Sequence, residues 1–261
     1  MPGSRQSTAA TPHLSIIIPA LNEERRLPPT LARIDDFLQT QSFTAEIVIV
    51  DNGSKDATAE YVRKYAETHP EVRLIQLAER GKGRAVKAGM LAAHGEHRFI
   101  CDADLSMPIE EVVKFLPPDS DGYAINIGTR EGPGARRIGE PYYRHLMGRI
   151  NNLIIKVMGL PGFEDTQCGF KMFSRETAED LFDVQRMNSI GFDVELLYIA
   201  KRRGYTIREV PITWYFDPDS RMRLVQDSLN MLREIWEIRQ NWKKGLYARR
   251  SPDGANSPAQ P

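Results

Sequence analysis

Two aspartates, Asp102 and Asp104, flank one small residue directly after the short run Arg98-Phe99-Ile100-Cys101. Two carboxylates at this spacing can bind one hard cation, because Mg²⁺ and Mn²⁺ prefer oxygen ligands and accept phosphate oxygens in the rest of their shell. A cation held there would neutralise charge on a leaving diphosphate. The same pattern also occurs in solvated acidic turns, but its place after a buried strand favours a metal site.

Asp51 follows a second apolar run, Glu46–Val50. Its carboxylate could accept a hydrogen bond from a uracil imide or from a ribose hydroxyl, and Gly53 permits a tight turn just after it. The competing interpretation is a plain turn with a helix cap at Ser54 or Asp56.

The segment Arg80–Arg84 places two glycines and three cations just before a predicted helix. Backbone N–H groups and the positive end of a helix suit a diphosphate. The spacing differs from that of a P-loop, and an ordinary charged loop remains the alternative.

The sequence contains no pattern for covalent catalysis. His94 and His97 straddle Gly95 and do not share a helix face, so structural roles are favoured for them. Cys101 falls in a predicted strand, and no histidine partner can be named for Cys168. Two cysteines without C-x-x-C spacing predict a reducing compartment rather than a disulfide scaffold.

The elements that must position these residues alternate between strand and helix. Short apolar runs predict buried parallel strands at 16–18, 46–50, 74–77 and 98–101. Helical spacing or capping signals lie between the strands, over 27–38, 54–65 and 83–94. Because ligands bind beyond the carboxyl ends of parallel strands, we expect the polar residues 22–24, 51–54 and 102–104 to converge in one crevice.

The second half of the chain is less regular. It predicts strands at 123–128, 170–173 and 206–210 and helices at 143–158 and 192–203. The 143–158 helix carries an apolar stripe formed by Tyr143, Leu146, Met147, Ile150, Ile154, Val157 and Met158. A long final helix is predicted to present one apolar face formed by Val225, Leu229, Leu232, Ile235, Trp236 and Trp242.

Composition places the protein among globular proteins, with 41% hydrophobic residues in 261 and a formal net charge of zero. No basic stripe with interleaved aromatic residues indicates nucleic-acid binding. No run approaches the roughly 20 apolar residues of a membrane span. We expect a cytoplasmic protein, or one peripheral on the cytoplasmic membrane face. We further expect a catalytic domain at 14–245, with a nucleotide-binding half (14–130) and an acceptor half (131–245), between disordered ends at 1–13 and 246–261.

The chain resembles family 2 glycosyltransferases of the GT-A fold, and among them the group of dolichyl-phosphate β-glucosyltransferases and dolichyl-phosphate mannose synthases. Widely shared matches are SIIIPALNEERRL (15–27), EIVIVDNGSKDAT (46–58), RGKGRAVKAGM (80–90) and FICDADLSMP (99–108). Narrower matches are INIGTR (125–130), DTQCGFKMF (165–173), GFDVELLYIAKRRGY (191–205) and EVPITW (209–214). The resemblance implies a single α/β domain with a Rossmann-like, mostly parallel sheet flanked by helices and a C-terminal amphipathic helix.

The resemblance also implies roles for matching residues. The nucleoside pocket would be lined by Pro19, Asn22, Glu23 and Asp51. Gly81 and Lys82 would lie near the diphosphate, and Asp102 and Asp104 would hold Mg²⁺ or Mn²⁺. Asp165, Gln167 and Lys171 would lie near the sugar and acceptor, with Asp104 and Asp165 as the catalytic residues. Arg130 and Arg221 would contact phosphate groups.

These roles predict an inverting transfer of a hexose, in the first place glucose from UDP-glucose, to a polyprenyl monophosphate. Residues 219–250 contain eight cations and four acids, and this basic segment with Trp236 and Trp242 suits an anionic membrane surface. The alternative is that this helix and the 143–158 helix pack on the sheet or form a homodimer.

Three rival functions stay open at this point. The absence of a predicted membrane span favours a family 2 transferase with a saccharide or small soluble acceptor. GDP-mannose is the rival donor. A non-catalytic nucleotide-sugar binder is the rival of another class, although it would tolerate loss of Asp104, which this chain retains.

Overall fold

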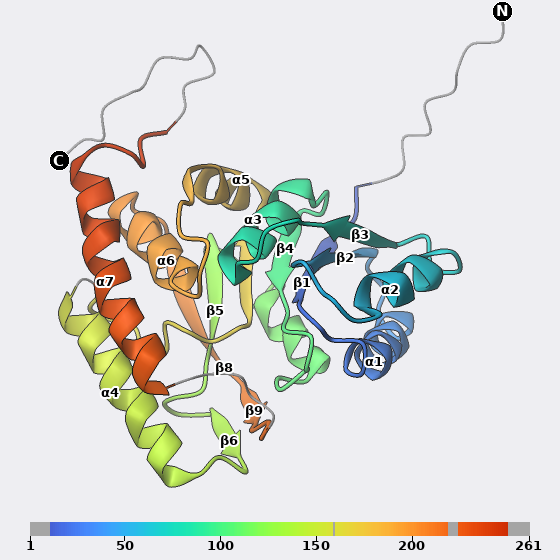
Figure 1. Cartoon of the computed structure of the whole chain (residues 1–261), viewed down its shortest axis with the longest axis horizontal. Helices are drawn as coiled ribbons and strands as arrows, with labels where there is room; N and C mark the ends of the chain where they lie inside the picture. The colour runs from blue at the N-terminus through green and yellow to red at the C-terminus, as the bar shows by residue number, and fades with distance from the viewer. Residues whose placement is uncertain (1–10, 159, 219–223, 250–261) are drawn as a thin grey trace, which may run out of the picture.

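The computed structural model describes residues 11–158, 160–218 and 224–249 (Figure 1). The strands are β1 (Leu14–Ala20), β2 (Ala45–Asp51), β3 (Val72–Gln76), β4 (His97–Ile100), β5 (Ile125–Thr129), β6 (Arg136–Ile138), β7 (Lys171–Ser174), β8 (Ile207–Pro211) and β9 (Thr213–Tyr215). The helices are α1 (Leu27–Gln39), α2 (Thr58–Ala66), α3 (Lys82–Ala92), α4 (Tyr142–Met158), α5 (Arg175–Val184), α6 (Phe192–Arg202) and α7 (Leu224–Lys243), with a 3₁₀ helix η1 (Ile109–Phe115).

A seven-stranded sheet in the order β3-β2-β1-β4-β7-β5-β8 forms the centre of the molecule. β7 is antiparallel to both of its neighbours, while the other pairs are parallel. The predicted α/β class with a mostly parallel sheet is therefore confirmed. The register of β1 with β2 and β4 brings the carboxyl ends of all three strands to one edge, as the crevice argument requires.

Helices cover both faces of this sheet because successive side chains of a strand point to opposite faces. Ile16 and Ile18 of β1 pack in a buried cluster with the apolar stripe of α1 and with η1. Ile17, between them, packs in a second cluster with side chains of α3, α5, α6 and α7.

The two amphipathic helices bury only part of their predicted apolar stripes. α4 and α7 lie side by side at one flank of the domain (Figure 1), but Leu146, Ile150 and Val157 of the predicted α4 stripe are exposed, and Ile155 is the buried contact. On α7, Ile235 of the predicted apolar face is buried. Trp236, expected on the same face, is 60% exposed because it lies one residue, or about 100° of rotation, further round the helix. The side chains of Val225 and Leu229 lie outside the described residues.

The packed part of the chain extends past residue 245, where the sequence predicted a disordered tail. Tyr247 is buried, with 2% of its surface exposed. At the other end, the backbone N–H of His13 donates to Thr44, so the expected disorder up to residue 13 ends earlier. The remainder of both predicted tails, 1–10 and 250–261, lies outside the described residues.

Candidate active site

A cleft of about 660 Å³ opens at the carboxyl edge of the sheet. The predicted site residues that line it are Pro19, Glu23, Gly81, Lys82, Asp102, Asp104, Arg130, Asp165 and Gln167. The structure thus brings together side chains that are up to 148 positions apart in the sequence, from Pro19 to Gln167.

The two aspartates after β4 face this cleft. Asp102 Oδ1 accepts a hydrogen bond from Lys82 Nζ at 2.7 Å. Asp104 Oδ1 accepts from the backbone N–H of Ser106 at 2.9 Å, and its Oδ2 lies 4.0 Å from Arg26 Nη1. Leu105, the residue after Asp104, has a φ of 46°, a left-handed conformation that is rare for a bulky residue and that clusters at functional sites.

The electrostatics of this acidic pair fit a divalent cation. Burial and the charge of Asp102 raise the pKa of Asp104. Burial also acts to raise the pKa of Asp102, but the ammonium of Lys82 outweighs it and lowers that pKa. No group of three or more His, Cys, Asp or Glu side chains in the described part of the chain could hold a metal. Two carboxylates with substrate phosphates completing the shell are, however, a usual arrangement for Mg²⁺.

The 51–54 turn is built by contacts with the loop after β1. Asp51 Oδ1 accepts from the Ser54 N–H at 3.0 Å, and Asp51 is buried and absent from the cleft lining. Asn22 adopts a φ of 54°, accepts from the Lys55 N–H at 2.8 Å, and also lies off the lining. Ser54 is not a helix cap, because its Oγ accepts from the Asn22 N–H, whereas Asp56 accepts from the Thr58 N–H at the start of α2.

The segment Arg80–Arg84, here called the donor loop, reaches the cleft through side chains rather than through its amides. The Gly81 N–H donates to Asn52 Oδ1 at 2.8 Å, and the Gly83 N–H donates to the Asn188 carbonyl at 3.0 Å. These two N–H groups, which were expected to bind a diphosphate, therefore already donate to acceptors within the protein. Lys82 carries the positive charge into the cleft, and although burial acts to lower its pKa, Asp102 raises the pKa above its usual value.

Asp165 forms a two-pronged ion pair with Arg130. Arg130 Nε donates to Asp165 Oδ2 at 2.6 Å and Nη2 donates to Oδ1 at 2.9 Å. Burial acts to raise the pKa of Asp165, but the Arg130 guanidinium and its hydrogen bonds lower it to about 2. A carboxylate with this pKa is a weak base, so the geometry favours an anchor for Arg130 over the predicted proton acceptor.

Lys171 does not reach the cleft, contrary to the acceptor role implied for it. Its ammonium is fully buried, lies 2.7 Å from Asp193 Oδ1, and donates to the Cys168 carbonyl. Gln167, the residue directly before Cys168, does line the cleft. Arg221 lies outside the residues that the structure describes.

The comparisons with known proteins agree with this geometry. The sequence profile of Glycosyl transferase family 2 matches residues 15–182. The chain belongs to glycosyl transferase family 2. A dolichyl-phosphate beta-glucosyltransferase of Trichomonas vaginalis is 35% identical over 247 residues, covering 90% of this chain and 73% of the relative. The human dolichyl-phosphate beta-glucosyltransferase is 32% identical over 252 residues, covering 91% and 78%.

Solved structures establish the fold of this family 2 glycosyltransferase as GT-A-like. Glucosyl-3-phosphoglycerate synthase from Mycobacterium tuberculosis, in complex with Mn²⁺, UDP-glucose and phosphoglyceric acid, superposes with a TM-score of 0.61 at 18% identity, covering 87% of this chain and 79% of that chain. A mannosyltransferase from Pyrobaculum calidifontis, in complex with GDP-Man and Mn²⁺, gives a TM-score of 0.52 at 23% identity, covering 82% and 59%. Among the described residues, no helix is long and apolar enough to cross a membrane.

Several cleft residues of the acceptor half were not predicted from the sequence. Arg137 lies between Glu131 and Glu140, with ion-pair distances of 2.7 and 2.6 Å. Trp214 of β9 lies under Arg130 and Arg137, 5.4 and 5.7 Å from their guanidinium carbons. The small β6–β9 sheet brings these groups together from segments 77 positions apart at Arg136 and Thr213, so no local spacing signals the arrangement. The EVPITW match was the one available signal for Trp214.

Gly169 is expected to be indispensable in this glycosyltransferase, because a β-carbon there would lie 1.9 Å from Asp102 Oδ2. We expect Gly169→Ala to displace Asp102 and to lower kcat/KM at least about a hundredfold, with a raised metal requirement. The control is Gly148→Ala, since a methyl group there meets no atom within 4 Å and should leave the metal requirement unchanged. Metal titrations of both variants decide this, and an unchanged titration for Gly169→Ala would contradict the role given to Asp102.

Proposed function

We propose that this family 2 glycosyltransferase transfers glucose from UDP-glucose to a polyprenyl monophosphate, with inversion at the anomeric carbon. The observation that carries the proposal is the similarity, at 30–38% identity over most of the chain, to proteins named dolichyl-phosphate beta-glucosyltransferases. The chemistry of the cleft supports it on both the donor and the acceptor side.

The donor side is the strand edge that carries Pro19, Glu23, Lys82 and the two aspartates. Asp102 and Asp104 would hold Mg²⁺ or Mn²⁺, which when bound neutralises charge on the leaving diphosphate. Lys82, kept protonated by its contact with Asp102, adds a second positive charge close to the same carboxylates. A protein that only binds a nucleotide sugar does not have to stabilise a leaving diphosphate. This cluster of charged groups therefore favours a catalytic function.

The acceptor side is formed by α4 and the β6–β9 sheet. Arg144, Met147 and Arg149 of α4 line the cleft. Arg144 stacks over the Phe216 ring with its guanidinium carbon 5.1 Å from the ring centre, and it forms no ion pair with any residue that the structure describes. The Arg144 guanidinium is held at the cleft wall by stacking on an aromatic ring, so its N–H groups can bind the oxygens of a phosphate monoester.

The reaction then needs little help from a base. A phosphate monoester has a second pKa near about 6, so the acceptor is largely a dianion at neutral pH. One acceptor oxygen attacks the anomeric carbon opposite UDP, the bond between that carbon and the diphosphate oxygen breaks, and the electron pair leaves with UDP. No proton has to be removed, which is consistent with an Asp165 whose pKa of about 2 makes it a poor base.

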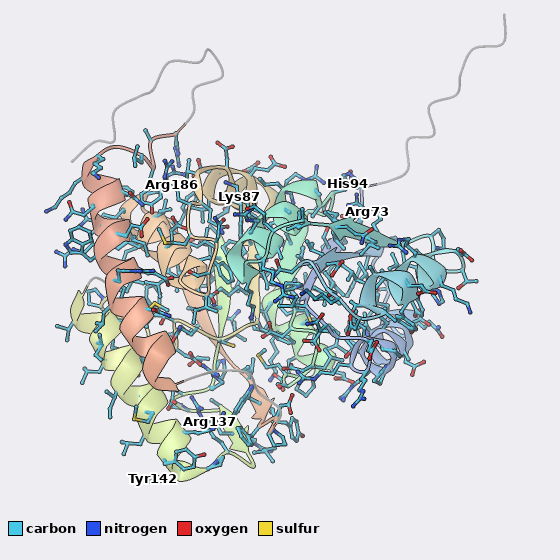
Figure 2. The ribbon with its side chains drawn as sticks, in the orientation of Figure 1. Arg73, Lys87, His94, Arg137, Tyr142 and Arg186 are labelled. Carbon is cyan, nitrogen blue, oxygen red and sulfur yellow. The ribbon has the colours of Figure 1, made fainter. Side chains whose placement is uncertain are left out.

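The outer face of α4 supports a membrane-bound acceptor. Its exposed apolar residues are Tyr142, Tyr143, Leu146, Ile150, Leu153 and Val157. Tyr142 and Val157, at the two ends of the helix, are 78% and 79% exposed. Figure 2 shows Tyr142 at the lower end of α4 and Arg137, which lines the cleft, to the right of this helix. One helix therefore offers apolar side chains to a bilayer and arginines to a lipid phosphate.

This surface gives a second prediction. The double variant Leu146→Asp/Leu153→Asp is expected to lower the affinity for vesicles of phosphatidylcholine and phosphatidylserine by about tenfold or more, since both side chains are exposed and apolar. Sedimentation with vesicles measures the change. Val113→Asp is the matched control, because Val113 is an exposed apolar residue of η1 away from the cleft. Equal binding by all three proteins would rule out α4 as the membrane contact.

The proposed function is tested with purified protein, Mg²⁺ and either UDP-glucose or GDP-mannose, with and without a short polyprenyl phosphate. UDP release from UDP-glucose that depends on the lipid phosphate is the expected result. Nucleotide release that does not depend on the lipid phosphate would reject this acceptor and support a saccharide or small soluble one. Release from GDP-mannose alone would reject the donor.

A further inference from the structure

The segment 185–191, between α5 and α6, packs directly against the donor loop. The Asn188 carbonyl accepts hydrogen bonds from the N–H groups of Gly83 and Arg84, at 3.0 and 3.4 Å. Gln185 Nε2 donates to the Gly83 carbonyl at 2.8 Å. A β-carbon on Gly81 or Gly83 would lie 2.4 Å from a carbonyl oxygen of this segment, so the two segments touch with no room for a side chain. Any shift of 185–191 must therefore move the donor loop.

The segment is itself held by Glu195, a fully buried carboxylate of α6. Glu195 accepts from the Arg186 N–H at 3.0 Å and from the Met187 N–H at 2.9 Å, using one oxygen for each. A third donor, the Tyr247 hydroxyl, lies 2.7 Å from Glu195 Oε1. A charged group without solvent depends on such donors, because each one replaces a lost hydrogen bond to water.

Tyr247 reaches Glu195 because the chain reverses after α7. Gly245 has a φ of 69°, a conformation typical of the residue that ends a helix, and the Leu246 N–H donates back to the Asn241 carbonyl at 3.0 Å. Arg203 Nη2 donates to the Tyr247 carbonyl at 2.7 Å and fixes the turn. Figure 2 shows Arg186 between Lys87 of α3 and the end of α7.

We propose that Tyr247 and Glu195 are positioning residues for the sugar-nucleotide donor: they hold 186–188 in place, and 186–188 in turn hold the donor loop that presents Lys82. Neither side chain lines the cleft, so both act through the backbone of the segment between them. The inference rests on the proposed function in one respect: the proposed function identifies the ligand of the donor loop as a nucleoside diphosphate sugar.

Tyr247→Phe tests the inference because it removes one oxygen and leaves the ring in place. Tyr205→Phe is the matched control: its hydroxyl also binds a carboxylate, Asp180 Oδ2 of α5 at 2.6 Å, rather than Glu195. The first readout is hydrogen–deuterium exchange of the full-length proteins without ligand. The amides of Gly83, Arg84, Arg186 and Met187 should exchange about tenfold faster in Tyr247→Phe than in wild type, and at the wild-type rate in Tyr205→Phe.

The second readout is steady-state kinetics with UDP-glucose and a short polyprenyl phosphate. In Tyr247→Phe we expect KM for the donor to rise about tenfold, with KM for the acceptor unchanged. A loss of stability alone would lower the active fraction of enzyme without changing either KM. Unchanged exchange at Gly83 and Arg84, or faster exchange with an unchanged donor KM, would overturn the inference. A wild-type protein that does not turn over UDP-glucose would overturn the proposed donor instead, while the exchange comparison still decides whether Tyr247 controls the donor loop.

Discussion

Replacement of Asp104 by asparagine is expected to lower kcat/KM by about a thousandfold while leaving the protein folded. Removal of one carboxylate from the acidic pair weakens the binding of a divalent cation and the neutralisation of the leaving diphosphate, which is worth several kcal/mol. The fold should tolerate the change, because burial and Asp102 raise the pKa of Asp104 and so make its charge a cost to the folded state. Activity at several Mg²⁺ and Mn²⁺ concentrations, together with thermal unfolding, measures both effects.

The control for this experiment is Asp121→Asn, a neutralised aspartate that is exposed and does not line the cleft. It should retain wild-type activity. Full activity of Asp104→Asn, or a loss of activity that only reflects unfolding, would remove Asp104 from the candidate metal site.

The second large effect concerns Arg130 and Asp165, whose roles a double-mutant cycle can separate. If Asp165 serves to hold Arg130, then Arg130→Ala and Asp165→Asn should each lower kcat/KM by about a hundredfold, and the double variant should be no worse than Arg130→Ala alone. If Asp165 is instead a general base, its replacement should cost about as much in the Arg130→Ala protein as in wild type. Four values of kcat/KM decide between the two.

Stability gives an independent measure of the same pair. Asp165→Asn leaves the largely buried Arg130 guanidinium without its carboxylate, and we expect a loss of about 3–5 kcal/mol in the free energy of unfolding. The double variant should recover part of this loss, since it also removes the unpaired cation. Urea unfolding of the four proteins checks this, and additive losses would contradict the close pairing.

The pH dependence follows from the sign of the Asp165 shift. Its folded-state pKa of about 2 lies below the usual aspartate value. The stability from the ion pair is therefore fully present above that usual value and is lost as the pH falls towards 2. No titration of Asp165 falls within the range of ordinary assays. An acidic limb of kcat/KM near about pH 6 should instead follow the acceptor phosphate and should move when a phosphonate analogue replaces it.

The alternating strands and helices of the first hundred residues, and the edge at which the polar motifs meet, could be predicted from the amino-acid sequence, whereas α5, β6 and β9 were not predicted. Apolar runs such as 16–18 and 46–50 have the length and composition of strands buried on both faces, and βαβ alternation leaves few arrangements for them. The location of Glu23, Asn52, Asp102 and Asp104 in one cleft followed from the rule that ligands bind beyond the carboxyl ends of parallel strands. Local sequence patterns do not identify a substrate. The classes of donor and acceptor proposed for this protein came from the family resemblance, which the comparisons confirmed.

The partner of each polar group and the coverage of each apolar face depend on how the chain folds in three dimensions. Asp165 pairs with Arg130, which is 35 positions away and reaches it from the end of β5. Lys171 lies outside the cleft because it pairs with Asp193 in the interior. The stripe on α4 is periodic enough to predict burial, yet no sheet face is placed against most of it. The physical reason is the same in each case: periodicity fixes which side of an element is apolar, whereas pairing and coverage depend on contacts between distant segments.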